Sequence, residues 1–151
     1  MSTLKTRLET DLRTAMKTRD ELVTSTLRMA LAAVRTAEVS GKQARELSED
    51  EVRAVLTAEA KKRREAATAF GDAGRAEQAQ RERAEEEVLV GYLPTQLSDD
   101  ELSSVVTAAL AGLDLTGKGA MGPAMKAAQA AVAGRAEGGR VAAEVRRQLA
   151  G

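Results

Sequence analysis

The chain has 151 residues, enough for one domain or two small ones. It contains neither cysteine nor histidine, which excludes disulfides, makes a zinc site very unfavourable and removes the usual histidine-dependent catalytic triads. Lys and Arg together number 23 and equal the 23 Asp and Glu, a balance that argues against a strongly basic nucleic-acid binder but leaves a local basic patch open. Aromatic residues make up only 1%, so we expect a core of Leu, Val, Ala and Met.

The N-terminal residues do not resemble a secretory signal peptide, because charged residues separate Leu4, Leu8 and Leu12. No apolar run approaches the roughly 20 residues that a membrane-spanning helix needs. We therefore expect a cytoplasmic protein that does not associate with membranes.

A first helix is predicted by an apolar stripe at four-residue spacing, formed by Leu4, Leu8, Leu12 and Met16. Asp20 is the expected N-cap of a second helix that continues to about Val39. Ser40 and Gly41 should end this helix, with Gly41 as its C-terminal signal.

The third helix has the clearest start in the first half of the chain. Ser48 and Glu51 have the spacing of a capping box, and Leu47 and Val52 occupy the positions of a hydrophobic staple. This pattern predicts a helix that begins at Ser48 and continues to Gly71.

A fourth helix over about residues 75–90 is dominated by charged side chains, and its apolar residues crowd at its C-terminal end. Proline at position 94 disfavours a helical Leu93, so the chain should break there. We place a domain boundary at this break, between an N-terminal helical domain over residues 1–93 and a C-terminal domain over residues 95–151.

The C-terminal domain repeats the capping signal, with Ser98 as the cap and Glu101 three residues later. A sixth helix should run from about Met121 to Ala133 and stop at Gly134, and a seventh should follow Gly139. No segment shows the alternation typical of strands. The predicted fold class is all-α, with long helices in the N-terminal domain and a small three-helix C-terminal domain.

Few residues are candidates for catalysis. Ser25 is a serine in a helix interior with cationic residues nearby, whereas Ser48 and Ser98 are explained as caps. The carboxylates at 99–101 suit the first turn of a helix, and those at 85–87 suit a solvated helix face. We expect no catalytic residue, no cofactor and no metal site.

Two groups of basic residues are candidates for binding. A C-terminal cation set consists of Lys118, Lys126, Arg135, Arg140, Arg146 and Arg147. Within it, the glycines around Arg135 and Arg140 suit either a phosphate site at a helix N-terminus or an ordinary turn between helices. A second basic set consists of Arg28, Arg35, Lys61, Lys62, Arg63 and Arg64. Four consecutive cations at 61–64 spread around a helix, so they fit a solvated face paired with Glu59 and Glu65 as well as a docking face.

Several segments together resemble the GatB/YqeY family over nearly the whole chain. They are Leu27-Arg28-Met29, Arg63-Arg64-Glu65, Tyr92-Leu93-Pro94-Thr95-Gln96-Leu97-Ser98, Met121-Gly122-x-x-Met125-Lys126 and Gly134-Arg135-Ala136-Glu137-Gly138. The sequence departs from the family pattern at Glu137, where Asp is usual, and at Gly138-Gly139, where Gly-Lys is usual. Both departures should soften the cap of the last helix without changing the fold.

The resemblance implies a C-terminal domain similar to the tail of the B subunit of glutamine-dependent aminoacyl-tRNA amidotransferase, a tail associated with tRNA binding. It therefore implies a binding module for tRNA or for a tRNA-bearing protein complex, with phosphate contacts from the C-terminal cation set. A protein-interaction adaptor in translation is the alternative, with the second basic set in its docking face. Carbon–nitrogen ligase activity with glutamine as amido donor, as part of a complex, is a further alternative that the family association implies.

Overall fold

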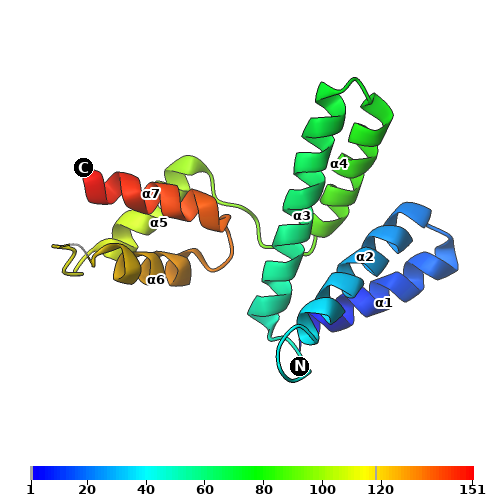
Figure 1. The fold of residues 1–151 in the computed structure, drawn as a ribbon, viewed down its shortest axis with the longest axis horizontal. Helices are drawn as coiled ribbons and strands as arrows, with labels where there is room; N and C mark the ends of the chain where they lie inside the picture. The colour runs from blue at the N-terminus through cyan, green and yellow to red at the C-terminus, as the bar shows by residue number, and fades with distance from the viewer. Residues whose placement is uncertain (1, 118) are drawn as a thin grey trace. The chain divides into compact units, whose positions relative to one another are not determined.

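The computed structural model describes residues 2–117 and 119–151, and in these ranges it contains seven helices and no strand (Figure 1). The predicted all-α fold class is confirmed. The helices are α1 (Thr3–Thr18), α2 (Glu21–Glu38), α3 (Glu49–Asp72), α4 (Ala76–Val90), α5 (Asp99–Leu110), α6 (Met121–Val132) and α7 (Gly138–Ala150).

Most of the predicted helix bounds agree closely with the structure. Asp20 caps α2 by accepting a hydrogen bond from the Val23 amide at 3.1 Å, as expected. Helix α2 ends at Glu38, next to the expected end at about Val39, and the Ser40 hydroxyl donates to the Ala37 carbonyl at 2.9 Å. Helix α7 begins at Gly138, before the Gly139 that it was expected to follow.

The chain divides into two compact units, Met1–Leu93 and Pro94–Gly151. The assignment of these units as separate domains stays a prediction. Within the described residues, no helix is both long enough and apolar enough to cross a bilayer.

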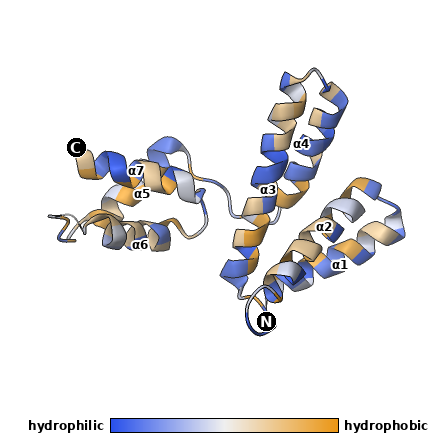
Figure 2. Ribbon diagram, viewed as in Figure 1, coloured by the Kyte–Doolittle hydropathy of each residue, from blue (hydrophilic) through white to orange (hydrophobic). Residues whose placement is uncertain are grey.

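The first unit consists of two helix pairs, α1 with α2 and α3 with α4, and α2 packs against both helices of the second pair (Figure 1). Its core is built from Leu, Val and Ala side chains, of which Leu8, Leu27, Val34, Leu56 and Leu89 are fully buried. Most of α4 is hydrophilic and its apolar residues lie at its C-terminal end (Figure 2). The part of the α3–α4 pair beyond this core is consequently held by small side chains and by charges.

The start of α3 also stabilises the start of α1. Ser48 and Glu51 form the predicted capping box, and the staple residue Leu47 is buried. The adjacent Glu49 carboxylate accepts hydrogen bonds from the backbone amides of Thr3 and Leu4, both at 2.9 Å. One carboxylate of α3 therefore satisfies two amides at the open end of α1 and complements its dipole.

A second contact anchors the end of α4 to α1. The Tyr92 hydroxyl donates a hydrogen bond to Asp11, and the Arg7 guanidinium lies 4.5 Å from the centre of the Tyr92 ring. Burial of the ring, together with the Asp11 carboxylate, raises the pKa of Tyr92 above its ordinary value. The phenol therefore stays protonated as a hydrogen-bond donor.

The second unit is a three-helix bundle with its own apolar core. Fully buried Val106, Val132, Val141 and Val145 form its centre, drawn from all three helices. Ser98 and Glu101 form the second predicted capping box. The Leu97 amide donates to the Arg135 carbonyl at 2.7 Å, so the segment before α5 is tied to the turn between α6 and α7.

The end of α6 carries backbone strain that the sequence does not reveal. Gly134 has the expected positive φ of 79°, but the preceding Ala133 is already left-handed, with φ 52° and ψ 45°. A left-handed conformation costs a residue with a Cβ about 1 kcal/mol relative to glycine. Ala133 is exposed, so a substitution there removes no packing.

We predict that Ala133→Gly raises the free energy of unfolding of the second unit by about 0.5 kcal/mol, because the relief of strain exceeds the extra entropy of the unfolded glycine. Urea denaturation of the full chain, followed by circular dichroism, measures the change. Ala130→Gly is the matched control, since the same substitution at an exposed position inside α6 should destabilise by about 0.5–1 kcal/mol. Equal losses at both positions would contradict the strain at Ala133.

Candidate nucleic-acid interface

The C-terminal cation set does not form a single free basic surface. Lys118 lies outside the described residues, and three of the other five cations are engaged by the chain itself. Arg135 turns back onto the end of α6, where its Nε donates to the Val132 carbonyl at 3.2 Å and its Nη2 to the Ala131 carbonyl at 3.5 Å. Its charge therefore complements the negative end of the α6 dipole.

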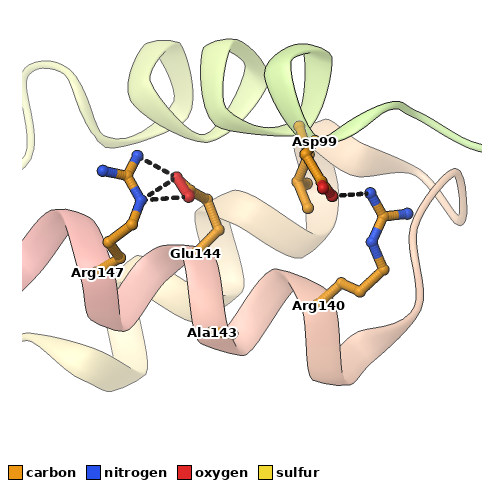
Figure 3. Close-up of a pocket in the computed structure, with 6 residues that line it drawn as sticks. Asp99, Arg140, Ala143, Glu144 and Arg147 are labelled. Carbon is orange, nitrogen blue, oxygen red and sulfur yellow. Dashed lines mark hydrogen bonds and ion pairs between the residues drawn. The ribbon is translucent and has the colours of Figure 1, made fainter.

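Arg140 and Arg147 line a shallow groove between α5 and α7, with a volume of about 240 Å³ (Figure 3). Arg140 Nη2 donates to the Leu97 carbonyl and to Asp99 Oδ1, both at 2.9 Å. Arg147 forms a bidentate ion pair with Glu144, in which Nε lies 2.7 Å from Oε1 and Nη2 lies 2.6 Å from Oε2. The two arginines thus join α5 to α7 and brace α7, and carboxylates already neutralise them.

The predicted combination of a glycine-rich helix start and two arginines is not assembled. Helix α7 begins at Gly138, and its N-cap residue Glu137 forms no side-chain capping bond, as expected where Glu replaces Asp. Gly139 has no neighbouring atom near the position that a Cβ would occupy, so the helix start is open. However, Arg135 points to α6 and Arg140 to Leu97 and Asp99, so neither is left for an anion at this end.

Lys126 and Arg146 are the members of the set that remain available. Both are exposed, and neither forms a hydrogen bond or an ion pair with any residue that the structure describes. The second unit also contains as many carboxylates as cations, namely Asp99, Asp100, Glu101, Asp114, Glu137 and Glu144. Among the described cations of this unit, a phosphate contact would therefore depend on these two side chains.

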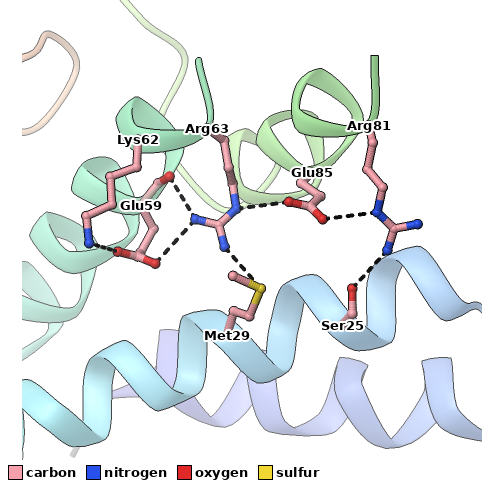
Figure 4. A network of polar contacts seen from close by, with 7 residues as sticks. All are labelled: Ser25, Met29, Glu59, Lys62, Arg63, Arg81 and Glu85. Atoms are coloured by element: carbon pink, nitrogen blue, oxygen red, sulfur yellow. Dashed lines mark hydrogen bonds and ion pairs between the residues drawn. The ribbon is translucent and has the colours of Figure 1, made fainter. Parts of the chain in front are cut away.

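The second basic set contains a buried arginine. The Arg63 side chain is only 5% exposed and lies between two carboxylates, with Nη1 3.3 Å from Glu59 Oε1 and Nε 3.6 Å from Glu85 Oε2 (Figure 4). Its Nη1 also donates to the Glu59 carbonyl at 3.0 Å, and its Nη2 contacts Met29 Sδ at 3.6 Å. Arg63 therefore belongs to the interior where α2, α3 and α4 meet and contributes nothing to an exposed basic surface.

The neighbours of Arg63 at 61–64 are exposed but paired with carboxylates. Lys62 lies 3.1 Å from Glu59, Arg64 lies 3.5 Å from Glu86, and Lys61 lies 4.0 Å from Glu65. The pairing with Glu59 and Glu65 expected for a solvated helix face is therefore observed. Arg28 and Arg35 differ, because both are exposed on α2 and no ion pair is recorded for them among the described residues.

The serine considered for catalysis is part of the same network. Ser25 Oγ accepts a hydrogen bond from Arg81 Nη2 at 3.4 Å, and Arg81 in turn contacts Glu85 (Figure 4). An arginine remains protonated in proteins and does not act as a general base toward a hydroxyl.

Burial and the Glu85 carboxylate raise the pKa of the adjacent Glu82. Among the described residues, no group of His, Cys, Asp and Glu could hold a metal ion.

The local density of basic residues in the sequence does not predict which cations are left without a carboxylate partner. The run at 61–64 is the densest in the chain, yet carboxylates one turn away and across the α3–α4 pair engage it. Arg13 and Lys17 lie outside both basic sets, although both are exposed on α1 and neither has a carboxylate partner in the described ranges. Spacing along the helix does not reveal them, because Glu9 stands four positions before Arg13 and Asp20 three after Lys17, and only the structure shows that these acids form no ion pair with them in the described ranges.

We predict that Arg63→Ala lowers the free energy of unfolding by about 3 kcal/mol, because Glu59 and Glu85 would lose their buried cation and keep only the more exposed Lys62 and Arg81. Chemical denaturation of the full chain gives this value. Lys61→Ala, two residues earlier and on the exposed side of α3, should change stability by less than about 0.5 kcal/mol. Adding Glu85→Gln to Arg63→Ala should recover part of the loss, and no recovery would contradict the electrostatic explanation.

A pH dependence follows from the pair between Glu144 and Arg147. Hydrogen bonds from Arg147 and Gln148 lower the pKa of Glu144 from 4.5 to about 2. Because the pKa of the folded state is lowered, this carboxylate stabilises the fold above pH 4.5, and the contribution is lost as the pH falls toward 2. We predict that the stability difference between the wild type and Glu144→Gln is largest near pH 7 and shrinks toward pH 2. The same series on Asp100→Asn, an exposed carboxylate of α5, should show a smaller change with pH.

Comparison with known proteins agrees with the whole-chain resemblance. The family model described as Yqey-like protein matches residues 5–149, nearly the whole chain. No curated protein matches the chain. Because the match spans both helical units rather than one, it shows that this chain belongs to the family of Yqey-like proteins.

Proposed function

We propose that this chain is a non-catalytic binding protein that contacts tRNA, or a protein complex carrying tRNA, through its C-terminal unit. The resemblance of this unit to the tail of the B subunit of glutamine-dependent aminoacyl-tRNA amidotransferase supports a contact with tRNA. The observation that carries the proposal is the exposure of Lys126 and Arg146 without a carboxylate partner among the described residues. Such side chains neutralise phosphates without first giving up an internal ion pair.

The composition of the chain also limits how such a contact is made. Phe70 and Tyr92 are its only aromatic residues, and both belong to the first unit, so the second unit has no ring on which bases could stack. Contacts with the sugar–phosphate backbone of a folded RNA then remain, and these read shape rather than sequence. With few free cations, the affinity should be modest and sensitive to salt.

A protein partner is the second candidate function, and one observation favours it. Each unit has equal numbers of cations and carboxylates, which suits a protein surface better than a polyanion. A pull-down from native lysate with and without nuclease separates the two candidates. Protein partners that survive nuclease treatment would support the adaptor, whereas recovery of tRNA and ribosomal material that nuclease removes would support RNA binding.

We predict that the full chain retards bulk tRNA in a gel at 50 mM salt and that the retardation weakens several-fold at 200 mM salt, because each phosphate contact releases counterions. Lys126→Glu with Arg146→Glu should weaken binding at least fivefold at 50 mM salt. The matched control is Arg75→Glu with Arg83→Glu, the same change of charge at exposed positions of the first unit. No retardation at low salt, or an affinity that does not depend on salt, would refute the proposed function.

A further inference from the structure

The helix pair α1–α2 carries the largest group of cations that the described structure leaves without a carboxylate partner. Arg13, Lys17 and Arg28 are all exposed. Arg13 Nη2 donates a weak hydrogen bond to the Thr10 hydroxyl at 3.4 Å, and no side-chain hydrogen bond to a described residue is recorded for Lys17 or Arg28. Arg35 is also exposed; its nearby carboxylate, Glu38, is already engaged by Lys5 Nζ at 2.9 Å. At 61–64, by contrast, each cation forms an ion pair with a carboxylate.

The carboxylates of the same helix pair are largely engaged elsewhere. Asp11 accepts the hydrogen bond from the Tyr92 hydroxyl, and Asp20 caps α2 through the Val23 amide. Residues 3–38 contain seven Lys and Arg against five Asp and Glu, whereas the first unit as a whole is balanced. Glu38 pairs with Lys5, and Asp11 lies 4.0 Å from Arg7, so the acids engaged within this helix pair serve cations other than Arg13, Lys17, Arg28 and Arg35.

Helix geometry places these cations on one side of the pair. On α2, Met29 faces α3 through its contact with Arg63, and Arg28 and Arg35 lie about 100–120° around the helix from it. On α1, Asp11 faces Tyr92, and Arg13 and Lys17 lie on the far side of the helix from it, at about 160° and 120°.

The two helices run antiparallel, and the pair between Lys5 and Glu38 joins the start of α1 to the end of α2. This register brings Arg13 and Arg28 to about the same level. The cations therefore lie on the outer face of the pair, turned away from α3 and α4.

From this placement we infer that the outer face of α1–α2, defined by Arg13, Lys17, Arg28 and Arg35, binds the phosphate backbone of RNA. The inference rests on the proposed function and assigns it a second contact surface, in the N-terminal unit. Exposed arginine and lysine side chains on two adjacent helices can follow a phosphate backbone without base recognition.

The composition of this face favours RNA over an acidic protein. Protein interfaces usually bury an apolar or aromatic centre. The buried leucines of α1 and α2 point into the core, no aromatic residue lies on either helix, and the large apolar side chains exposed on the two helices are Met16 and Met29, of which Met29 lies on the side of Arg63. A face of cations without an apolar centre matches a sugar–phosphate backbone better.

Fluorescence anisotropy with labelled bulk tRNA tests the inference on the full chain. Arg13→Glu with Arg28→Glu should weaken binding about tenfold or more at 50 mM salt and reduce the slope of log affinity against log salt by about 2. Arg75→Glu with Arg83→Glu, the same charge change on exposed residues of the first unit, should stay within twofold of the wild type. Arg13→Gln with Arg28→Gln, which introduces no new charge, should give a smaller loss in the same direction, and circular dichroism checks the helix content of every variant.

The possible outcomes separate this inference from the proposed function. If the wild type binds tRNA and Arg13→Glu with Arg28→Glu binds equally well, the inference is overturned while the proposed function stands. If the wild type binds no RNA at low salt, the proposed function fails, and the inference fails with it. Displacement of the RNA by poly-glutamate at equal charge concentration would assign this face to an acidic protein and overturn the inference, whereas RNA that stays bound supports it.

Discussion

The ion network around Arg63 is the interaction on which the first unit depends. This side chain is enclosed by Glu59 of its own helix, Glu85 of α4 and Met29 of α2, so three helices converge on one guanidinium. The fully buried side chains of the unit are leucines, valines, alanines and a threonine, which bury less area than aromatic residues. With such a core, the relative placement of the helices is specified by where a buried charge finds its partners, since any other packing would leave that charge uncompensated.

Ion pairs perform a related task in the second unit. Arg140 holds the start of α5 against α7 through the Leu97 carbonyl and Asp99, and Arg147 pairs with Glu144 along α7. These arginines were expected to face a ligand, and they instead join elements of the bundle. A cation that is needed to stabilise the fold is expensive to redirect to a phosphate, because its carboxylate partner would lose its own neutralisation. The cations most suited to binding are consequently the ones that the fold does not use.

This distinction changes where an RNA contact is expected. Cations are numerous along the whole chain, but the described structure neutralises the dense run at 61–64 and Arg140 and Arg147 with carboxylates, and it engages Arg135 with backbone carbonyls. The free ones are fewer and more dispersed, and in the described ranges they include Lys126 and Arg146 of the second unit, the outer face of α1–α2, and Arg75 and Arg83 at α4. Affinity for a polyanion would then arise from several weak, salt-sensitive contacts and not from one strongly basic pocket.

Local signals in the sequence determined the helices and several of their starts. The capping boxes at Ser48 and Ser98 and the cap at Asp20 are formed as predicted, because they depend on side chains within three residues of the backbone groups they satisfy. The sequence also determined the aliphatic character of the cores, although methionine contributes only partly buried side chains in the second unit. Only the tertiary structure decided that Arg63 is buried, that Ala133 is left-handed and that Arg140 reaches Leu97 and Asp99. The partners of Arg140 lie more than 40 positions away, and Glu85 reaches Arg63 from another helix, so the fate of each charge depends on helix packing that no local pattern encodes.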